Sequence, residues 1–214
     1  MTMKLWEASK DQKNKSNLFR YENFLNQRYK IRFNKNYSKL HDWSIKNPEK
    51  FWSSIWDFSN VKGKKIEKFY KSKELFKNQF FLNSRLNFAE NLLSKNDNSK
   101  AITFVSENGY KEIRKWNELN LNVGKISFYL KKINIKEKER VAAYLPNLIE
   151  TVEFFLATVS IGAIWSSCSP DFGVNGVIER FAQIKPKVLI LCDRYYYNGK
   201  EINVVDRLHL ILKK

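Results

Sequence analysis

The sequence predicts an α/β protein with a helical segment at its N-terminus. Three short apolar runs that suit buried strands, "RVAAYLP", "AIWSSCS" and "KVLILCD", alternate with two stretches of helical periodicity. Of the 214 residues, 43% are apolar and 15% are aromatic, which is enough for a buried core. Right-handed crossovers would make the strands of this β-α-β-α-β order parallel. The run "KVLILCD" is apolar on both faces and is expected to be a central strand.

The first 95 residues are predicted to be helical, in two parts. Residues 1–36 are rich in Lys and Asn and are expected to be loosely helical. Residues 37–95 contain a clearer helix in "NPEKFWSSIWDF", where Asn47 can cap, Pro48 suits the first position and Glu49 suits the positive end. Its broad aromatic face predicts packing against other helices, and the turn "VKGKK" is expected to end it.

Near residue 100 the pattern changes to strands. "AITFVSENGYKEIRKW" predicts a hairpin around Asn108-Gly109, because this dipeptide favours the tight turns of hairpins. The following stretch has apolar residues at helical spacing, namely Leu119, Val123, Ile126 and Leu130.

Two further helices separate the three apolar runs. Asn147 and Glu150 have the spacing of a capping box for the first of them, and Gly162 is expected to end it. Its inner face is predicted to hold Leu148, Val152, Phe155 and Val159. The second helix is stopped by Pro186, and its apolar face holds Val174, Val177, Ile178 and Phe181.

The chain is strongly basic, with a formal net charge of +17. Residues 1–100 carry 22 basic and 10 acidic side chains, and residues 101–214 carry 17 and 12. Such a charge can indicate nucleic acid or an anionic membrane as a partner. Here the Lys residues are scattered between aromatic residues at helical spacing, and no zinc-finger or RNA-binding aromatic motif is present. We therefore expect neither a nucleic-acid nor a membrane partner.

The cysteines and the N-terminus favour a soluble, cytoplasmic protein. Cys168 and Cys192 are the only cysteines, and their apolar surroundings predict small core residues in a reducing compartment. "MTMKLWEASKDQ" lacks the apolar core of a secretory signal, and the most apolar stretch, residues 154–165, is too short to span a bilayer. His41 and His209 are isolated in the sequence, so no metal site is expected.

The stretch "SPDFG" follows the second strand and opens a helix. Ligands of α/β proteins bind at such positions, and the N–H groups of a helix start favour an anion. Pro170, Asp171 and Gly173 also suit an ordinary turn. The chain contains neither G-x-G-x-x-G nor G-x-x-x-x-G-K-[ST], so no nucleotide-binding fingerprint is present.

Several stretches, in order from about residue 4 to the end, resemble the acetoacetyl-CoA synthetase family. They are "LWEASK", "LHDWSIKNPEKFWSSIWDF", "LNFAENLL", "RVAAYLPN", "FLATVSIGAIWSSCSPDFGVNGVIERFAQIKPKVLILCD" and "YNGKE". The family belongs to the adenylate-forming enzymes, which activate a carboxylate with ATP and Mg²⁺ and then transfer the acyl group to CoA. The resemblance implies an acetoacetate–CoA ligase. It also implies an N-terminal extension at 1–36, an accessory segment at 37–95 and the incomplete start of the AMP-binding domain at 96–214.

The resemblance also implies that residues needed for catalysis are not in this chain. Family members use a Ser/Thr/Gly-rich phosphate loop ending in Lys, an acidic residue for the ribose, a Thr-Glu pair near Mg²⁺ and a Lys from a small C-terminal domain, and no stretch here matches these. Without them, charge developing on the α-phosphate has no preorganised partner. We expect the chain to be an N-terminal fragment that is inactive alone, with a separately encoded C-terminal half as a possible partner. No catalytic residue is assigned to it.

Three positions are implied to lie near CoA: Asp171, Tyr197 and Lys200. They match positions close to the CoA nucleotide in the acetyl-CoA relatives, where Arg stands in place of Tyr197 and Gly in place of Asp171. Lys200 keeps a positive charge that suits a phosphate. Since "SPDFG" and Lys200 each follow the carboxyl end of a parallel strand, we expect both on the same side of the sheet.

Three alternative functions remain open from the sequence. The first is another short-chain acyl-CoA synthetase of the same architecture. The second is a non-catalytic remnant or interaction module, and the third is a basic nucleic-acid binder. Binding that weakens steeply with added salt would distinguish the third.

Overall fold

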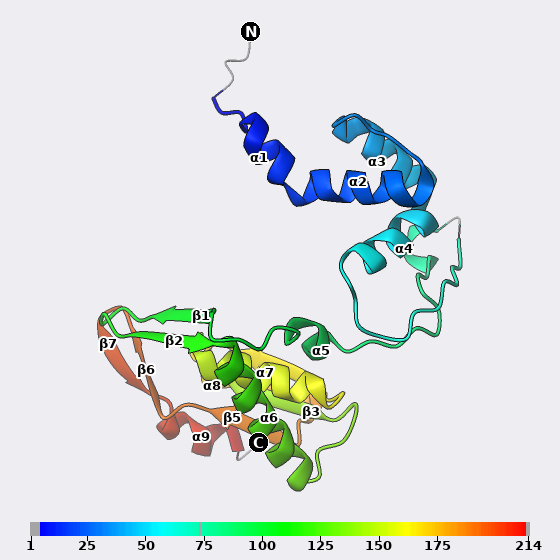
Figure 1. Ribbon diagram of the computed structural model, residues 1–214. Helices are drawn as coiled ribbons and strands as arrows, with labels where there is room; N and C mark the ends of the chain where they lie inside the picture. The colour runs from blue at the N-terminus through cyan, green and yellow to red at the C-terminus, as the bar shows by residue number, and fades with distance from the viewer. Residues whose placement is uncertain (1–4, 73, 213–214) are drawn as a thin grey trace. The chain divides into compact units, whose positions relative to one another are not determined.

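The computed structural model describes residues 5–72 and 74–212 of the chain. The chain divides into two compact units, Met1–Leu86 and Asn87–Lys214, coloured blue to teal and green to red (Figure 1). Among the described residues, none of the helices combines the length and apolar character needed to cross a bilayer.

The described part of the first unit contains four α-helices and a short 3-10 helix at Leu75–Lys77. The α-helices are α1 (Lys10–Lys15), α2 (Asn17–Tyr29), α3 (Tyr37–Lys46) and α4 (Pro48–Phe58). Tyr21, Leu25, Phe33 and Leu40 are buried together, against Phe51, Ile55 and Phe58 of α4. Residues of α2 and of the segment after it thus share one core with the two helices that follow, and α2 is a regular helix capped by Ser16 instead of a loose one.

The start of α4 differs from the prediction in one respect. Pro48 occupies the first helical turn and Glu49 lies beside it, as predicted. Asn47 is the N-cap residue, but its side chain makes no capping hydrogen bond to α4. Its amide instead donates to the Trp43 carbonyl at 3.1 Å. Only one residue separates α3 from α4, so the amide is used at the C-terminal end of α3.

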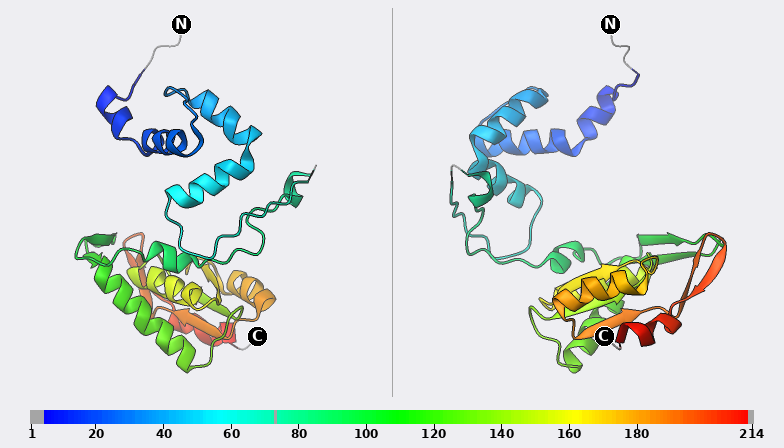
Figure 2. Two further views of the ribbon diagram at one scale, coloured as in Figure 1. Left: turned by 45° about the vertical axis from the view of Figure 1, so that its right-hand side comes forward. Right: turned by 180° about the vertical axis from the view of Figure 1, so that it is seen from behind.

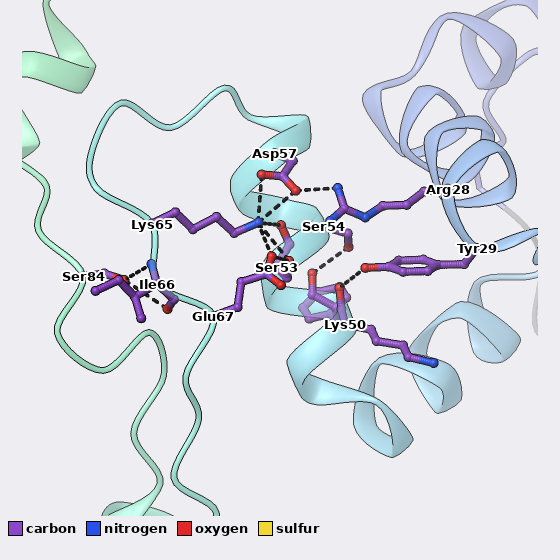
Figure 3. A network of polar contacts seen from close by, with 11 residues as sticks. Arg28, Tyr29, Lys50, Ser53, Ser54, Asp57, Lys65, Ile66, Glu67 and Ser84 are labelled. Carbon is purple, nitrogen blue, oxygen red and sulfur yellow. Dashed lines mark hydrogen bonds and ion pairs between the residues drawn. The ribbon is translucent and has the colours of Figure 1, made fainter.

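Lys65 ties the segment after α4 back to that helix (Figure 3). Its ammonium group lies 2.8 and 2.9 Å from the two carboxylate oxygens of Asp57, 2.7 Å from Glu67 and 2.9 Å from the Ser53 hydroxyl. Arg28 of α2 pairs with the same Asp57. Partial burial favours the neutral carboxyl, but hydrogen bonds from Lys65 and Arg28 outweigh it and hold the pKa of Asp57 below its usual value.

Replacing Lys65 with Met is expected to destabilise the first unit by about 1.5–3 kcal/mol, the usual range for hydrogen bonds to charged groups. The Lys65 side chain is only 18% exposed, so solvent screens these contacts weakly. A carboxyl with a lowered pKa stabilises the fold above its unfolded value of about 4 and loses this effect as the pH falls through the folded value. The difference in unfolding free energy between the variant and wild type should therefore become small in acid.

Urea unfolding read by hydrogen exchange in α4 measures this change. Lys77→Met is the matched control, because Lys77 is 63% exposed and its pair with Glu74, at 2.9 Å, lies at the surface. Equal effects of the two substitutions at neutral pH would show that the Lys65 contacts do not stabilise the unit.

In the second unit, a parallel sheet has the strand order β4-β3-β5. The strands are β3 (Arg140–Tyr144), β4 (Ile164–Cys168) and β5 (Val188–Leu191). Val141 of β3 pairs with Trp165 on one side and Val188 on the other, and both pairings are parallel, as predicted. The central strand is β3, so the prediction that "KVLILCD" is central was wrong for the described residues. Both faces of β5 are apolar because helices cover both sides of the sheet. This pattern does not indicate how many strands pair with it.

Helices cover both faces of the sheet. Helices α6 (Trp116–Lys132) and α7 (Ile149–Ser160) pack on the face that holds Val141, Trp165, Val188 and Ile190. Helices α8 (Val174–Ile184) and α9 (Val205–Leu212) pack on the face that holds Ala142, Tyr144, Leu189 and Leu191. The short helix α5 (Phe88–Leu92) lies beside α7, with the rings of Phe88 and Phe155 5.8 Å apart. The predicted α/β class is confirmed.

The ends and inner face of α7 correct two predictions. The N-cap is Leu148, not Asn147, and the Thr151 hydroxyl replaces Glu150 as the group that reaches back to the cap. This hydroxyl accepts from the Leu148 N–H at 3.4 Å and donates to the Pro146 carbonyl at 2.7 Å. The predicted face is only half-buried, and the most buried side chains are Ile149, Glu153, Leu156, Ala157 and Thr158. Gly162 follows the helix end with φ +76°, as predicted.

Two antiparallel hairpins lie beside the parallel sheet. The hairpin of β1 (Lys100–Val105) and β2 (Lys111–Lys115) turns at Asn108-Gly109, as predicted. The hairpin of β6 (Arg194–Tyr197) and β7 (Lys200–Asn203) was not predicted. It turns at Asn198 and Gly199, with φ of 51° and 70°, the pair of positive values that a two-residue type I′ turn requires.

Candidate functional site

The turn Ser169–Gly173 between β4 and α8 is anchored from beneath by a buried tyrosine. The Tyr144 hydroxyl, at the end of β3, lies 2.9 Å from the Pro170 carbonyl and 2.7 Å from the Phe172 carbonyl. Arg207 of α9 donates to the Pro170 carbonyl at 2.6 Å and to the Tyr144 hydroxyl at 3.0 Å. Tyr144 is 1% exposed, so these contacts form in a low-dielectric environment. The backbone of the turn is thereby fixed by two other elements.

The Asp171 carboxylate is engaged within the protein. One oxygen accepts from the Ser169 hydroxyl at 2.7 Å, and the other accepts from the Tyr195 hydroxyl of β6 at 2.9 Å. Burial, reinforced by the hydrogen bond to Asp171, raises the pKa of Tyr195 to about 12. The Tyr195 hydroxyl therefore remains a proton donor throughout the neutral range, and the turn is joined to the second hairpin.

Tyr197 and Lys200 face each other at the tip of the second hairpin. They are the last residue of β6 and the first residue of β7, they pair in the antiparallel register, and both are exposed. At the same tip, the Gly199 N–H donates to the Glu107 carboxylate at 3.2 Å. Glu107 belongs to the turn of the first hairpin, so the tips of the two hairpins meet (Figures 1 and 2).

A groove of about 510 Å³ lies between the two hairpins and the segment that follows β3. Its walls are largely aromatic and apolar, with Phe104, Tyr110, Pro146, Leu148, Tyr195, Tyr196 and Tyr197 among the lining residues. Arg194 and Glu107 add charge at the same groove. Because Pro146–Leu148 follow the carboxyl end of β3, the groove lies at the sheet edge where α/β proteins bind ligands. A planar ring with polar groups at its edge fits such walls.

The predicted site residues are only partly brought together. Tyr197 lines the groove, whereas Asp171 and Lys200 are not among its lining residues. Asp171 contacts Tyr195, which is two residues before Tyr197 on the same strand. In the part of the chain that the structure describes, no hydrogen bond or ion pair joins Asp171 to Lys200. The prediction that Lys200 follows the carboxyl end of the last parallel strand did not include strand β6, which lies between β5 and Lys200 in the chain.

Sequence reasoning missed Tyr144, Tyr195, Arg207 and the first-hairpin side of the groove. The Asn198-Gly199 dipeptide was an available signal for the second hairpin, since the same dipeptide at 108–109 predicted the first. Given that hairpin, strand alternation puts Tyr195 and Tyr197 on one face. No local pattern indicates the contacts of Arg207, because its partners are 37 and 63 residues away.

Comparison with family models and known proteins identifies the chain. Residues 93–213, more than half of the chain, match the model of the AMP-binding enzymes. The chain belongs to the AMP-binding enzyme family. Residues 37–92 match the model described as the acetyl-coenzyme A synthetase N-terminus.

The chain is similar to acetoacetyl-CoA synthetases within the AMP-binding family. It is 38% identical over 210 residues to the enzyme of Rhizobium meliloti, covering 98% of this chain and 32% of the relative. It is 40% identical over 208 residues to the Xenopus tropicalis enzyme, covering 95% and 31%. The structure of acetoacetyl-CoA synthetase from Streptomyces lividans matches with a TM-score of 0.91 and 27% identity, over 99% of this chain and 33% of that one. This chain spans about a third of the length of each of these relatives.

Proposed function

We propose that this chain forms the N-terminal part of an acetoacetate–CoA ligase, which makes acetoacetyl-CoA from acetoacetate, ATP and CoA through an acyl-adenylate. The observation that carries the proposal is 38–40% identity to acetoacetyl-CoA synthetases over 95–98% of the chain. The chain is also 33% identical to the malonamoyl-CoA synthetase VrtB of Penicillium aethiopicum, over a shorter stretch. The higher identities favour acetoacetate as the acid.

The proposal assigns a role to each part of the chain. Residues 1–36 form an N-terminal extension, residues 37–95 the accessory segment and residues 96–214 the start of the adenylation domain. ATP and Mg²⁺ are held elsewhere, since this sequence contains no phosphate-loop motif. The chain on its own does not catalyse the ligase reaction. Its two free cysteines, with pKa values raised by burial, suit a cytoplasmic, reducing compartment.

The groove between the hairpins fits the nucleotide portion of CoA. Its aromatic walls, to which Tyr197 contributes, suit a planar base. Lys200, opposite Tyr197 at the exposed tip, supplies a positive charge for a phosphate. Asp171 lies in the turn that supports this edge. CoA supplies the thiol that accepts the acyl group, and the residues of this chain bind and orient its nucleotide.

We propose that a separately encoded C-terminal half binds along the outer edge of β5. Support comes from β5 itself, which consists of Val and apolar Leu and Ile residues and pairs only with β3 among the described residues. A cavity of about 280 Å³ beside this strand is lined by apolar side chains that include Ile178, Phe181, Leu189 and Ile211. An apolar strand with a free edge is a template for pairing with another strand.

Calorimetric titration of CoA into the 214-residue chain tests the CoA site. Lys200→Ala should weaken CoA binding at least about tenfold, because a charge-assisted contact is lost. Lys138→Ala is the control, since Lys138 is 84% exposed and precedes β3 at the opposite edge of the sheet. Pantetheine, which has no phosphate, should bind equally to both variants. If Lys200→Ala binds CoA as tightly as wild type, Lys200 does not hold a phosphate.

A further inference from the structure

The hydrogen bond between Tyr195 and Asp171 is the link between the turn and the aromatic wall of the groove. The Tyr195 hydroxyl donates to Asp171 at 2.9 Å, and Tyr195 is one of the residues that line the groove, together with Tyr196 and Tyr197. Tyr195 is 7% exposed and Asp171 is exposed, so the contact lies at the boundary between the core and the surface. Tyr195 thus belongs to the aromatic wall of the groove and also contacts the turn that supports this wall.

The turn that supplies this support is held by several hydrogen bonds. Pro170 is fully buried and its carbonyl accepts from Tyr144 and Arg207, and the Phe172 carbonyl accepts from Tyr144 as well. Asp171 lies between these two residues, with its second carboxylate oxygen held by Ser169. The carboxylate that Tyr195 contacts is therefore fixed relative to the parallel sheet.

Apart from the Tyr195–Asp171 hydrogen bond, the hairpin on the other side is anchored by apolar packing at its base, where Ile202 also contacts the core, and by a contact at its tip. Its strands β6 and β7 pair with each other and not with the parallel sheet. Tyr196 and Arg194 both bond Glu201 within the hairpin, and these contacts cannot place the hairpin relative to the sheet. At the tip, the Gly199 N–H contacts Glu107 in an exposed position. At the base, Val204 and Tyr195 are its buried residues.

We propose that Tyr195 is a positioning residue, which holds strand β6 to Asp171 and so sets the aromatic wall against which the CoA nucleotide binds. The inference rests on the proposed function. Asp171 then acts through Tyr195 and does not touch the ligand. This role of Asp171 differs from the direct contact with CoA that the family resemblance implies.

Three variants separate positioning from ligand contact. Tyr195→Phe keeps the ring and removes the donor. Asp171→Ala removes the acceptor, whereas Asp171→Asn keeps an amide oxygen that can accept from Tyr195 and removes the charge. If Tyr195 is a positioning residue, Tyr195→Phe and Asp171→Ala should each weaken CoA binding about tenfold. The double variant should be little weaker than either single variant, and Asp171→Asn should bind CoA nearly as tightly as wild type.

Hydrogen exchange of the full chain without ligand gives an independent readout. The amides of residues 194–203 should exchange about tenfold faster in Tyr195→Phe and Asp171→Ala, those of residues 100–115 should not change, and Asp171→Asn should resemble wild type. Unchanged exchange at 194–203 in Tyr195→Phe overturns the inference, even if CoA binds normally. It is also overturned if Asp171→Asn alters CoA affinity and Tyr195→Phe does not. If the exchange pattern appears but wild type binds no CoA, Tyr195 still fixes the wall and the proposed function fails.

Discussion

Replacing Arg114 with Met is expected to destabilise the second unit by about 3–5 kcal/mol at neutral pH, the usual cost of leaving a buried charge without its partner. Arg114 of β2 lies 2.8 Å from Glu153 of α7, 3.1 Å from Glu112 and 3.7 Å from Glu150. The Glu153 side chain is only 4% exposed. After the substitution it would keep a single neutral donor, the Asn122 amide at 2.9 Å, beside two other carboxylates.

The pH dependence of this loss has a definite sign. Burial raises the pKa of Glu153, although the Asn122 hydrogen bond and the Arg114 charge act against it. A carboxyl with a raised pKa stabilises the fold below its unfolded value of about 4.3, and this contribution disappears as the pH rises through the folded value. Removing Arg114 raises the pKa of Glu153 further. The loss of unfolding free energy in the variant should therefore be small in acid and grow towards neutral pH. The loss in Lys65→Met has the same pH direction, although the pKa of its carboxyl partner Asp57 is lowered, whereas that of Glu153 is raised.

Urea unfolding at several pH values, read by hydrogen exchange in α7, measures this effect. The surface control is Arg194→Met, because Arg194 also meets two carboxylates, Asp193 and Glu201, but is 58% exposed. It should cost less than about 1 kcal/mol. Adding Glu153→Gln to Arg114→Met should recover most of the loss, since no buried charge then remains. A loss that persists in this double variant would point to the packing of the Arg114 side chain instead of its charge.

Glu153 illustrates a limit of sequence reasoning about this fold. Helical spacing in α7 predicted an apolar inner face, and the observed buried face includes a carboxylate. A charged residue can lie inside only if another element brings a partner, and Arg114 comes from a strand 39 residues earlier in the chain. Periodicity describes one element at a time and cannot contain this information.

The strands and turns were predictable to the extent that local chemistry determines them. The three parallel strands follow from short apolar runs, and the first hairpin follows from Asn108-Gly109. The position of β3 between the other two strands depends on which way each crossover travels, which the runs themselves do not record. Asp171 was found as a turn residue, but its partner Tyr195 depends on the folding of the second hairpin over that turn.

Replacing Leu156 with Ala should also be costly, by about 2–5 kcal/mol, and should separate stability from binding. Leu156 is fully buried in the core that α6 and α7 form on the sheet, together with Leu119, Val123 and Val141. Truncation loses apolar burial and leaves a cavity in a close-packed region. Leu121→Ala on α6 is the control, because Leu121 is 58% exposed and its loss should change stability by less than about 0.5 kcal/mol. Thermal and urea unfolding of both variants give the comparison.

The groove is lined by the two hairpins and by Pro146–Leu148 just before α7, and one of its residues, Tyr195, shares a second core with Tyr144 on the opposite face of the sheet from Leu156. If the Leu156 variant remains folded at low temperature, its CoA affinity should match that of wild type, although its unfolding free energy is much lower. Tyr195→Phe should show the reverse, with a weakened affinity and a modest loss of stability. The two substitutions therefore test whether the two faces of the sheet contribute separately, one to the stability of the unit and the other to the geometry of the groove. A parallel loss of affinity and stability in both variants would show that the two cores are coupled and that the groove has no support of its own.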